Sequence, residues 1–227
     1  MEITHTKTTM MSSTLDYYNA NADDYVRKNH TLAEPSARAR TFAQTILAGA
    51  WPGNTVRVLD AGSGSGRDTL IFMEAGLEVD AFDGSEAMAR ASTALTGKET
   101  RVMRFEDLKL PESHYDGIWA MASLLHVQRD DLPQVMSTLG SALKPGGLLV
   151  AGFKHGTQER LDPRQGRRFT DMTDGTVAEL IDQIGGFEFV ESRVDTPPET
   201  QTNQEPWYLV TLRRTAPAPR AKPRPTR

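Results

Sequence analysis

A glycine-rich turn between a short apolar run and a helical segment constrains the fold of this chain most strongly. Residues 56–60 read as a buried strand, residues 62–66 form the turn, and residues 68–74 have the pattern of a helix that Gly76 ends. Glycine has no side chain, so such a turn lets a ligand approach the backbone closely. The sequence therefore predicts a strand–turn–helix unit that binds a ligand at its turn.

The alternation of short apolar runs and helical patterns continues along the chain. It predicts strands at 77–82, 101–105, 115–121 and 148–153, helices at 86–95 and 132–143, and a helix-ending turn at Lys144-Pro-Gly-Gly147. Strands and helices in this order favour a parallel sheet with helices on both faces and right-handed crossovers. A helix at 177–184 and two closing strands, at 187–194 and 207–212, are expected to follow, the strands pairing as an antiparallel hairpin.

The segments outside this core give the expected domain organisation. Two helices are predicted before it, at 13–28 and 36–48, and a polar stretch after it, at 154–173. The chain then divides into a flexible N-terminus (1–13), an N-terminal helical lid (14–50), one α/β domain (51–212) and a basic, proline-rich tail (213–227).

Composition excludes several classes of protein. Hydrophobic residues make up 38% and charged residues 25%, as in folded globular proteins. Cysteine is absent, which excludes disulfides and thiolate metal sites, and no spacing of His, Asp and Glu argues for a metal. No apolar run approaches the roughly 20 residues of a membrane helix, and residues 1–13 lack the apolar core of a secretory signal. We expect a cytoplasmic protein without a membrane partner.

The charge is distributed unevenly. The net charge is −4, yet residues 213–227 hold six basic residues and no acid, which leaves a body near −10. Four prolines in that segment oppose a regular helix, so a solvated, disordered tail is the simplest interpretation. An electrostatic arm for RNA or an acidic surface is the alternative. The acidic body argues against a broad nucleic-acid interface.

Acidic residues follow three of the predicted strands. Asp60 ends the first, Asp83 follows the second, where an acid can hold ribose hydroxyls, and Glu106 follows the third, where it can accept from an adenine amino group. The dinucleotide pattern G-x-G-x-x-G/A has Arg67 at its last position here, and Asp60 would repel a pyrophosphate. S-adenosylmethionine (SAM), with its ammonium and sulfonium groups, suits this loop better. Roles for Asp60 and Asp83 as turn or cap residues stay open.

Several motifs occur together in one order. They are Asp60-Ala-Gly-Ser-Gly-Ser-Gly66, Asp83, Glu106-Asp107, Tyr115-Asp-Gly-Ile-Trp-Ala120, Leu125-His-Val127 and Leu143-Lys-Pro-Gly-Gly147. This set, over residues 55–153, resembles class I SAM-dependent methyltransferases. Residues 17–25 also resemble the N-terminal motif of small bacterial members, some of them named after tellurite resistance. The resemblance implies a Rossmann-like fold whose seven-stranded, mostly parallel sheet has helices on both faces and an antiparallel edge strand.

The resemblance also implies roles for individual residues in binding SAM. Asp60 would hold the methionine end of SAM, with Gly62, Ser63 and Gly64 lining it and Ala120 beside it. Asp83 would bind the ribose, and Gly84 and Met88 would pack on the adenosine. Glu106 and the Asp107 N–H would face the adenine. Many relatives carry Cys where this chain has Ser63, which is equally small. Met88 as a core residue and Glu106 as a solvated residue are the alternatives.

Methyl transfer needs alignment of the reacting atoms more than it needs a particular side chain. Candidate bases or substrate contacts are His126, Tyr18, Tyr25 and Lys154, with Tyr17 and His155 as further candidates. Tyr18 and Tyr25 lie seven residues apart and would share one helix face. Arg167 and Arg168 could bind an anionic substrate, although solvated arginines are the commoner case, and Trp207 reads as core.

The predicted function is therefore SAM-dependent methyl transfer to a small-molecule acceptor by in-line displacement. An RNA or protein methyltransferase that uses the basic tail is one alternative. A nicotinamide-dependent dehydrogenase on a similar fold and a SAM-binding module without catalysis are the others.

Overall fold

The structure is a computed structural model that describes residues 14–29, 33–51, 53–197 and 205–215. Its helices are a segment at 14–20, α2 (Ala22–Asn29), α3 (Ala33–Ala48), α4 (Arg67–Glu74), α5 (Glu86–Thr96), α6 (Leu132–Ala142) and α7 (Asp174–Ile184). Its strands are β1 (Arg57–Ala61), β2 (Glu78–Asp83), β3 (Arg101–Val102), β4 (Tyr115–Met121), β5 (Leu143–Lys154), β6 (Glu159–Leu161), β7 (Arg168–Thr170), β8 (Phe187–Asp195) and β9 (Trp207–Arg214). Two short 3-10 turns, η1 (Phe105–Asp107) and η2 (Leu124–His126), follow β3 and β4.

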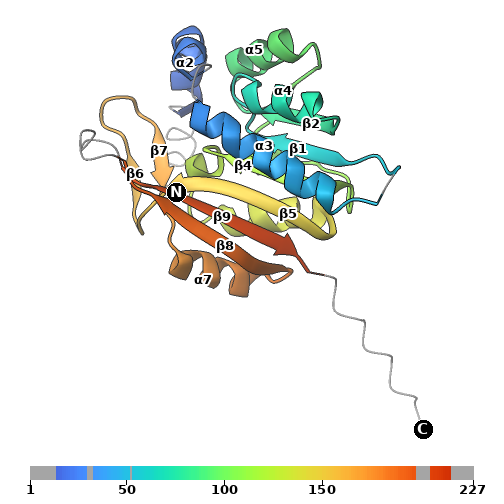
Figure 1. Ribbon diagram of the computed structural model, residues 1–227. Coiled ribbons are helices and arrows are strands. Elements are labelled where there is room, and N and C mark those ends of the chain that lie inside the picture. The colour runs from blue at the N-terminus through green and yellow to red at the C-terminus, as the bar shows by residue number, and fades with distance from the viewer. Residues whose placement is uncertain (1–13, 30–32, 52, 198–204, 216–227) are drawn as a thin grey trace.

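Seven strands form one twisted sheet in the order β3-β2-β1-β4-β5-β9-β8 (Figure 1). Strands β1 to β5 pair with one another in parallel, and β9 is antiparallel to both β5 and β8. This confirms the predicted Rossmann-like class of fold and the predicted pairing of the last two strands. The antiparallel strand lies one place in from the edge, because β9 inserts between β5 and the edge strand β8.

Alternation along the central strands divides the core in two. Val58 and Trp119 face one side of the sheet, where they pack with Phe42 of α3 and Phe72 of α4. Their chain neighbours, among them Leu59 and the residues flanking Trp119, face the other side, in the cluster that includes α6 and α7. Both faces of the parallel strands are therefore buried, as the continuous apolar runs predict. No described helix is long and apolar enough to cross a membrane.

Two boundaries differ from the prediction in the central sheet. Strand β3 covers only Arg101–Val102, since the chain turns into η1. The segment Lys144-Pro-Gly-Gly147 is part of β5 rather than a turn. The register shifts between Tyr115 and Gly117 opposite this segment, and Lys144 Nζ binds both carboxylate oxygens of Asp116 at 2.8 Å. The strand therefore begins at Leu143, before the residues where proline and glycine predicted a helix-ending turn.

The polar stretch at 154–173 contains a small antiparallel hairpin, β6–β7, which the sequence did not predict. The guanidinium of Arg129 holds it from outside, donating to the carbonyl oxygens of Thr157, Gln158 and Asp171. These contacts join segments far apart in the sequence, so local patterns give no sign of them.

The predicted termini fall largely outside the described residues, which include neither 1–13 nor 216–227. Where the tail was expected to begin, the prediction is wrong, because Arg213 and Arg214 belong to β9. Arg213 pairs with Glu188 of β8 at 2.8 Å, and Arg214 donates to the carbonyl oxygen of Gly186.

Gly117 of β4 lies against Phe42 and Ile46 of α3, and this contact provides a test of the packing. A Cβ atom there would lie 2.7 Å from Phe42 and 2.8 Å from Ile46. We expect Gly117→Ala to lower the free energy of unfolding by about 1–3 kcal/mol, the usual cost of overpacking. Urea denaturation measures this. Gly49→Ala is the matched control, since a Cβ there meets nothing closer than 3.7 Å. An unchanged stability of Gly117→Ala would contradict this packing.

Candidate active site

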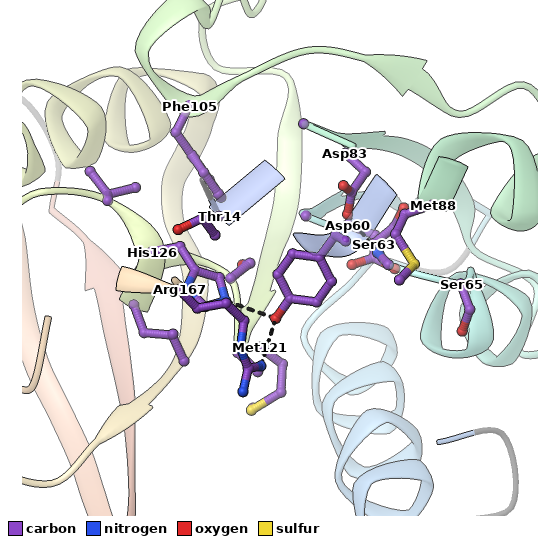
Figure 2. Close-up of a pocket in the computed structure, with 18 of the residues that line it drawn as sticks. Thr14, Asp60, Ser63, Ser65, Asp83, Met88, Phe105, Met121, His126 and Arg167 are labelled. Atoms are coloured by element: carbon purple, nitrogen blue, oxygen red, sulfur yellow. Dashed lines mark hydrogen bonds between the residues drawn. The ribbon is translucent and has the colours of Figure 1, made fainter. Parts of the chain in front are cut away.

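One cavity of about 450 Å³ lies at the carboxyl ends of the parallel strands, where open α/β sheets bind ligands. Residues from β1, β2, β4, β5 and the turns after them line it, and the N-terminal residues Thr14, Leu15, Tyr18 and Tyr25 cover it. Figure 2 shows Asp60, Asp83 and Met88 on one side of this cavity and His126 and Arg167 on the other.

The glycine-rich loop turns tightly around the end of β2. Both Gly62 and Ser63 donate their N–H groups to the carbonyl oxygen of Phe82. Gly62 has φ +80°, and a Cβ on it would lie 2.4 Å from the Cβ of Ser123. Gly64 also has a positive φ, +55°, but a Cβ there would meet no atom within 4 Å. Gly62 is therefore required by packing, whereas Gly64 leaves open space at the cavity wall.

Asp83 ties this loop to the start of α5. Its Oδ2 accepts the N–H of Gly64 and its Oδ1 accepts the N–H of Ser85, both at 2.8 Å. Burial raises the pKa of Asp83 to about 6, and the two N–H groups oppose that rise. Each oxygen keeps acceptor capacity for a ligand hydroxyl.

Asp60 lies at the floor of the cavity and is buried. Thr69 Oγ1 of α4 donates to Asp60 Oδ2 at 2.6 Å. Burial raises the pKa of Asp60 to about 8, and the nearby carboxylate of Asp68 adds to the rise. A ligand cation would favour its ionised form, because opposite charges stabilise one another strongly in a buried site.

Two polar atoms on the wall that holds the glycine loop have no partner within the described structure. They are Glu106 Oε1 and Ser63 Oγ, and both are buried. Buried polar atoms are almost always hydrogen-bonded in native proteins, so such atoms point to a bound ligand. A ligand with an amino group near Glu106, hydroxyls at Asp83 and a cation near Asp60 would satisfy this wall. The donor set therefore fits the adenine, ribose and methionine parts of SAM.

A chain of hydrogen bonds crosses the opposite wall (Figure 2, dashed lines). His126 Nδ1 lies 2.6 Å from the carbonyl oxygen of Arg168. A carbonyl oxygen only accepts, so Nδ1 carries the proton and Nε2 accepts from the Tyr18 hydroxyl at 2.9 Å. Arg167 Nη1 donates to the same hydroxyl at 3.3 Å. Burial lowers the pKa of His126 to about 4, so the ring is neutral near pH 7.

The N-terminal helices bridge the two walls of the cavity. Asn19 Oδ1 accepts from Ser85 Oγ at 2.7 Å at the start of α5, and Thr14 Oγ1 accepts the N–H of Arg168 on β7. The predicted single helix is interrupted at Asn21. Tyr18 and Tyr25 nevertheless lie together, as expected for one helix face: their rings meet edge to face, with centroids 5.4 Å apart.

Lys154 ends β5 at the same wall as His126. Its Nζ lies 3.7 Å from the centroid of the Trp207 ring and donates to the carbonyl oxygen of Glu205. Trp207, read from the sequence as core, lines the cavity. His155 pairs outside the named strands with Met172 and does not line it.

The structure brings most of the predicted site residues together. The predicted residues that line the cavity are Tyr18, Tyr25, Asp60, Gly62, Ser63, Gly64, Asp83, Gly84, Met88, Glu106, His126 and Lys154. Ala120 does not line it, because it is fully buried in the core and β4 runs on to Met121. Asp107 does not either. Its side chain is largely exposed, and its N–H donates to the carbonyl oxygen of Arg104 inside η1.

Several lining residues were not predicted from the sequence. They include Thr14, Leu15, Arg38, Ser65, Arg67, Asp68, Arg104, Phe105, Trp119, Met121, Ala122, Ser123, Leu125 and Val127. Phe105 is adjacent to the Glu106 motif, so its position could have been found. Ala122 has φ +57°, an uncommon conformation for a residue with a side chain, directly after β4. The described residues contain no cluster of three or more His, Asp or Glu side chains that could hold a metal ion.

Comparison with known proteins bears directly on this site. Residues 59–151, which include the glycine loop, Asp83 and His126, match the family model described as a methyltransferase domain. The match covers less than half of the chain, and it shows that residues 59–151 are similar to a methyltransferase domain. The donors and acceptors of the cavity wall fit the chemical groups of SAM.

Solved structures of methyltransferases share the fold of this chain. The 1,6-didemethyltoxoflavin-N1-methyltransferase of Burkholderia thailandensis aligns over 95% of this chain and 92% of its own, with a TM-score of 0.70 and 23% identity. The magnesium protoporphyrin IX methyltransferase of Synechocystis covers 91% of this chain and 97% of its own, with a TM-score of 0.66 and 16% identity. Among curated proteins, Hemagglutinin 1 of Eikenella corrodens is 24% identical over 128 residues, which are 55% of this chain. The match spans 40% of the length of that relative.

Asp83 generates a prediction on the pH dependence of cofactor binding. Its pKa of about 6 means that the carboxylate ionises between pH 5 and 7, and only the ionised form accepts hydrogen bonds at both oxygens. We expect the affinity for S-adenosylhomocysteine (SAH) to rise across this interval. In Asp83→Asn the affinity should fall about tenfold or more at pH 7.5 and lose this part of its pH dependence. Isothermal titration calorimetry measures both.

Asp80→Asn is the matched control, because Asp80 lies on the same strand and binds the Tyr115 hydroxyl, outside the cavity. Its SAH affinity should equal that of the wild type. An Asp83→Asn protein that binds SAH with wild-type affinity at pH 7.5 would exclude Asp83 from cofactor binding.

Proposed function

We propose that the protein transfers a methyl group from SAM to a small-molecule acceptor by in-line displacement. The observation that carries the proposal is the division of one cavity into two walls. One wall holds the glycine loop, Asp83 and Glu106, and the other holds His126 and Lys154. The first suits the cofactor, and the second is free to contact an acceptor.

The cover over the cavity supports a small acceptor. Residues 14–29 bridge the two walls through Asn19 and Thr14, and Tyr18 and Tyr25 reach into the cavity. We propose that residues 14–50 act as a lid over the domain at 51–212. A macromolecular acceptor would have to displace this lid, whereas a small molecule fits beneath it. The Burkholderia neighbour, with its bound 1,6-didemethyltoxoflavin, is a methyltransferase of a small molecule. We also propose that the protein belongs to the tellurite-resistance-like branch of the family and that it is cytoplasmic.

Alignment supplies most of the catalysis in this account. When bound, SAM supplies an electrophilic methyl group, whose bond to sulfur breaks with both electrons going to sulfur. The protein holds the acceptor atom in line with that bond and excludes water, and orientation of this kind contributes roughly 7–11 kcal/mol. We propose that Asp60, Gly62, Ser63, Gly64, Asp83, Gly84, Met88 and Glu106 hold the cofactor.

The proton of the acceptor leaves through Tyr18 and His126. An acceptor O–H or N–H becomes far more acidic as its lone pair bonds to the methyl carbon. The Tyr18 oxygen takes that proton while its own proton moves to His126 Nε2, which already accepts from it at 2.9 Å. A base with a pKa of about 4 is weak, but it suffices for a proton released this late.

Tyr18→Phe tests this arrangement once an acceptor is known from a screen of small phenolic, heteroaromatic and amine nucleophiles with SAH formation as the signal. The variant keeps the ring contacts with Tyr25 but removes the hydroxyl. We expect turnover to fall about 10- to 100-fold, at the low end of general acid–base effects, with SAH affinity within twofold of wild type. Tyr115→Phe, a buried tyrosine outside the cavity, is the control that should keep full turnover.

Either of two results would count against the proposal. Failure of the whole screen with SAH-competent protein would contradict a small-molecule methyltransferase. Full turnover in Tyr18→Phe would remove the Tyr18–His126 pair from the mechanism and leave alignment alone.

A further inference from the structure

The cations that line the cavity occur on both walls, with Arg67 and Arg104 on the cofactor side, but the carboxylates occur on one wall only. All four lining carboxylates, Asp60, Asp68, Asp83 and Glu106, come from β1, α4, β2 and η1, on the cofactor side. The wall that holds His126 also contains Lys154 and Arg167, and none of the described residues on that wall that line the cavity is acidic. An acceptor bound there meets two positive charges.

Arg167 and Lys154 pack against aromatic rings and donate hydrogen bonds to neutral oxygens, and Arg167 also forms a long ion pair with Asp162. The guanidinium carbon of Arg167 lies 4.7 Å from the centroid of the Tyr17 ring and 5.1 Å from that of Phe169. Its hydrogen bond goes to the Tyr18 hydroxyl, and Asp162 is 3.8 Å away. Lys154 is hydrogen-bonded to the carbonyl oxygen of Glu205 and lies over the ring of Trp207.

This environment is costly for two cations. Arg167 Nε is buried and has no partner in the described structure. Burial lowers the pKa of Lys154, the Glu205 carboxylate opposes that shift, and the neighbouring Arg160 and Arg167 add to it. An anion placed between Lys154 and Arg167 would give Arg167 Nε an acceptor and favour the charged form of Lys154.

We propose that the methyl acceptor is a small aromatic carboxylate, whose carboxylate binds between Lys154 and Arg167. Its ring packs against the aromatic residues of the same wall, among them Phe169 and Trp207. This inference rests on the proposed methyl transfer and assigns the substrate class of that site. Lys154 and Arg167 are then specificity-determining residues for the acceptor and do not hold the cofactor.

The test uses matched sets of probes on SAH-loaded protein. Each set has one ring system as carboxylate, amide and amine: benzoate, benzamide and benzylamine; 2-naphthoate and its amide and amine; indole-3-acetate, indole-3-acetamide and tryptamine. Calorimetry should show at least one carboxylate binding about tenfold or more tightly than its amide, the effect of a charge-assisted hydrogen bond. Lys154→Met and Arg167→Leu should each reduce that preference about tenfold, with SAH affinity within twofold of wild type.

Lys98→Met and Arg90→Leu are the matched controls, since both are exposed and neither lines the cavity. They should keep the wild-type preference. The inference is wrong if no carboxylate exceeds its amide. It is also wrong if the Lys154 and Arg167 variants lose SAH affinity, because these cations would then hold the cofactor. If a variant does not fold, the inference is tested by the affinities of the wild-type protein for each carboxylate and its amide. Wild-type protein that fails to bind SAH would overturn the proposed function as well. Protein that binds SAH but prefers no carboxylate would overturn the substrate class alone.

Discussion

The bonds from Asp83 to the N–H groups of Gly64 and Ser85 hold the site together. Through them, one buried carboxylate fixes both the loop after β1 and the start of α5. Phe82, the residue before it, accepts the N–H groups of Gly62 and Ser63, so the glycine loop is wound around the end of β2. The parallel register of β1 and β2 places these groups together, with Ala61 opposite Phe82. The sheet therefore determines the shape of the loop.

Burial gives this arrangement its chemistry. The pKa values of Asp60 and Asp83 are raised because little water reaches them, so each is easier to ionise when a ligand supplies a positive charge or hydrogen-bond donors. A site of this kind favours a cationic ligand with a ribose over a pyrophosphate. On the opposite wall, His126 is neutral and its tautomer is fixed by the carbonyl oxygen of Arg168. One wall of the cavity therefore presents buried carboxyl groups, and the other presents a neutral imidazole.

Sequence patterns predicted the elements that depend on local chemistry. The strand at 115–121 was predicted with its exact limits, and the acids and glycines predicted to contact the cofactor line the cavity except Asp107. Periodicity and turn residues specify such elements directly. Tyr18, His126 and Lys154, which the sequence offered as candidate bases or substrate contacts, all line the cavity.

The remaining features depend on contacts between distant segments. The β6–β7 hairpin is held by Arg129, and the strand at Lys144–Gly147 by pairing across an irregular register. Trp207 lines the cavity because β9 inserts beside β5, which no local pattern indicates. Arg38 reaches the cavity from α3, where it also pairs with Asp195 at the end of β8.

The most direct test of the central claim is the thermal stability of the protein with four ligands: SAM, SAH, NAD and NADP. A ligand at one hundred times its dissociation constant stabilises the fold by about 2.7 kcal/mol, which raises the melting temperature of a chain of this size by roughly 5–10 °C. The account predicts this rise with SAM and SAH and no rise with the nicotinamide nucleotides. A rise with NAD or NADP and none with SAH would contradict it.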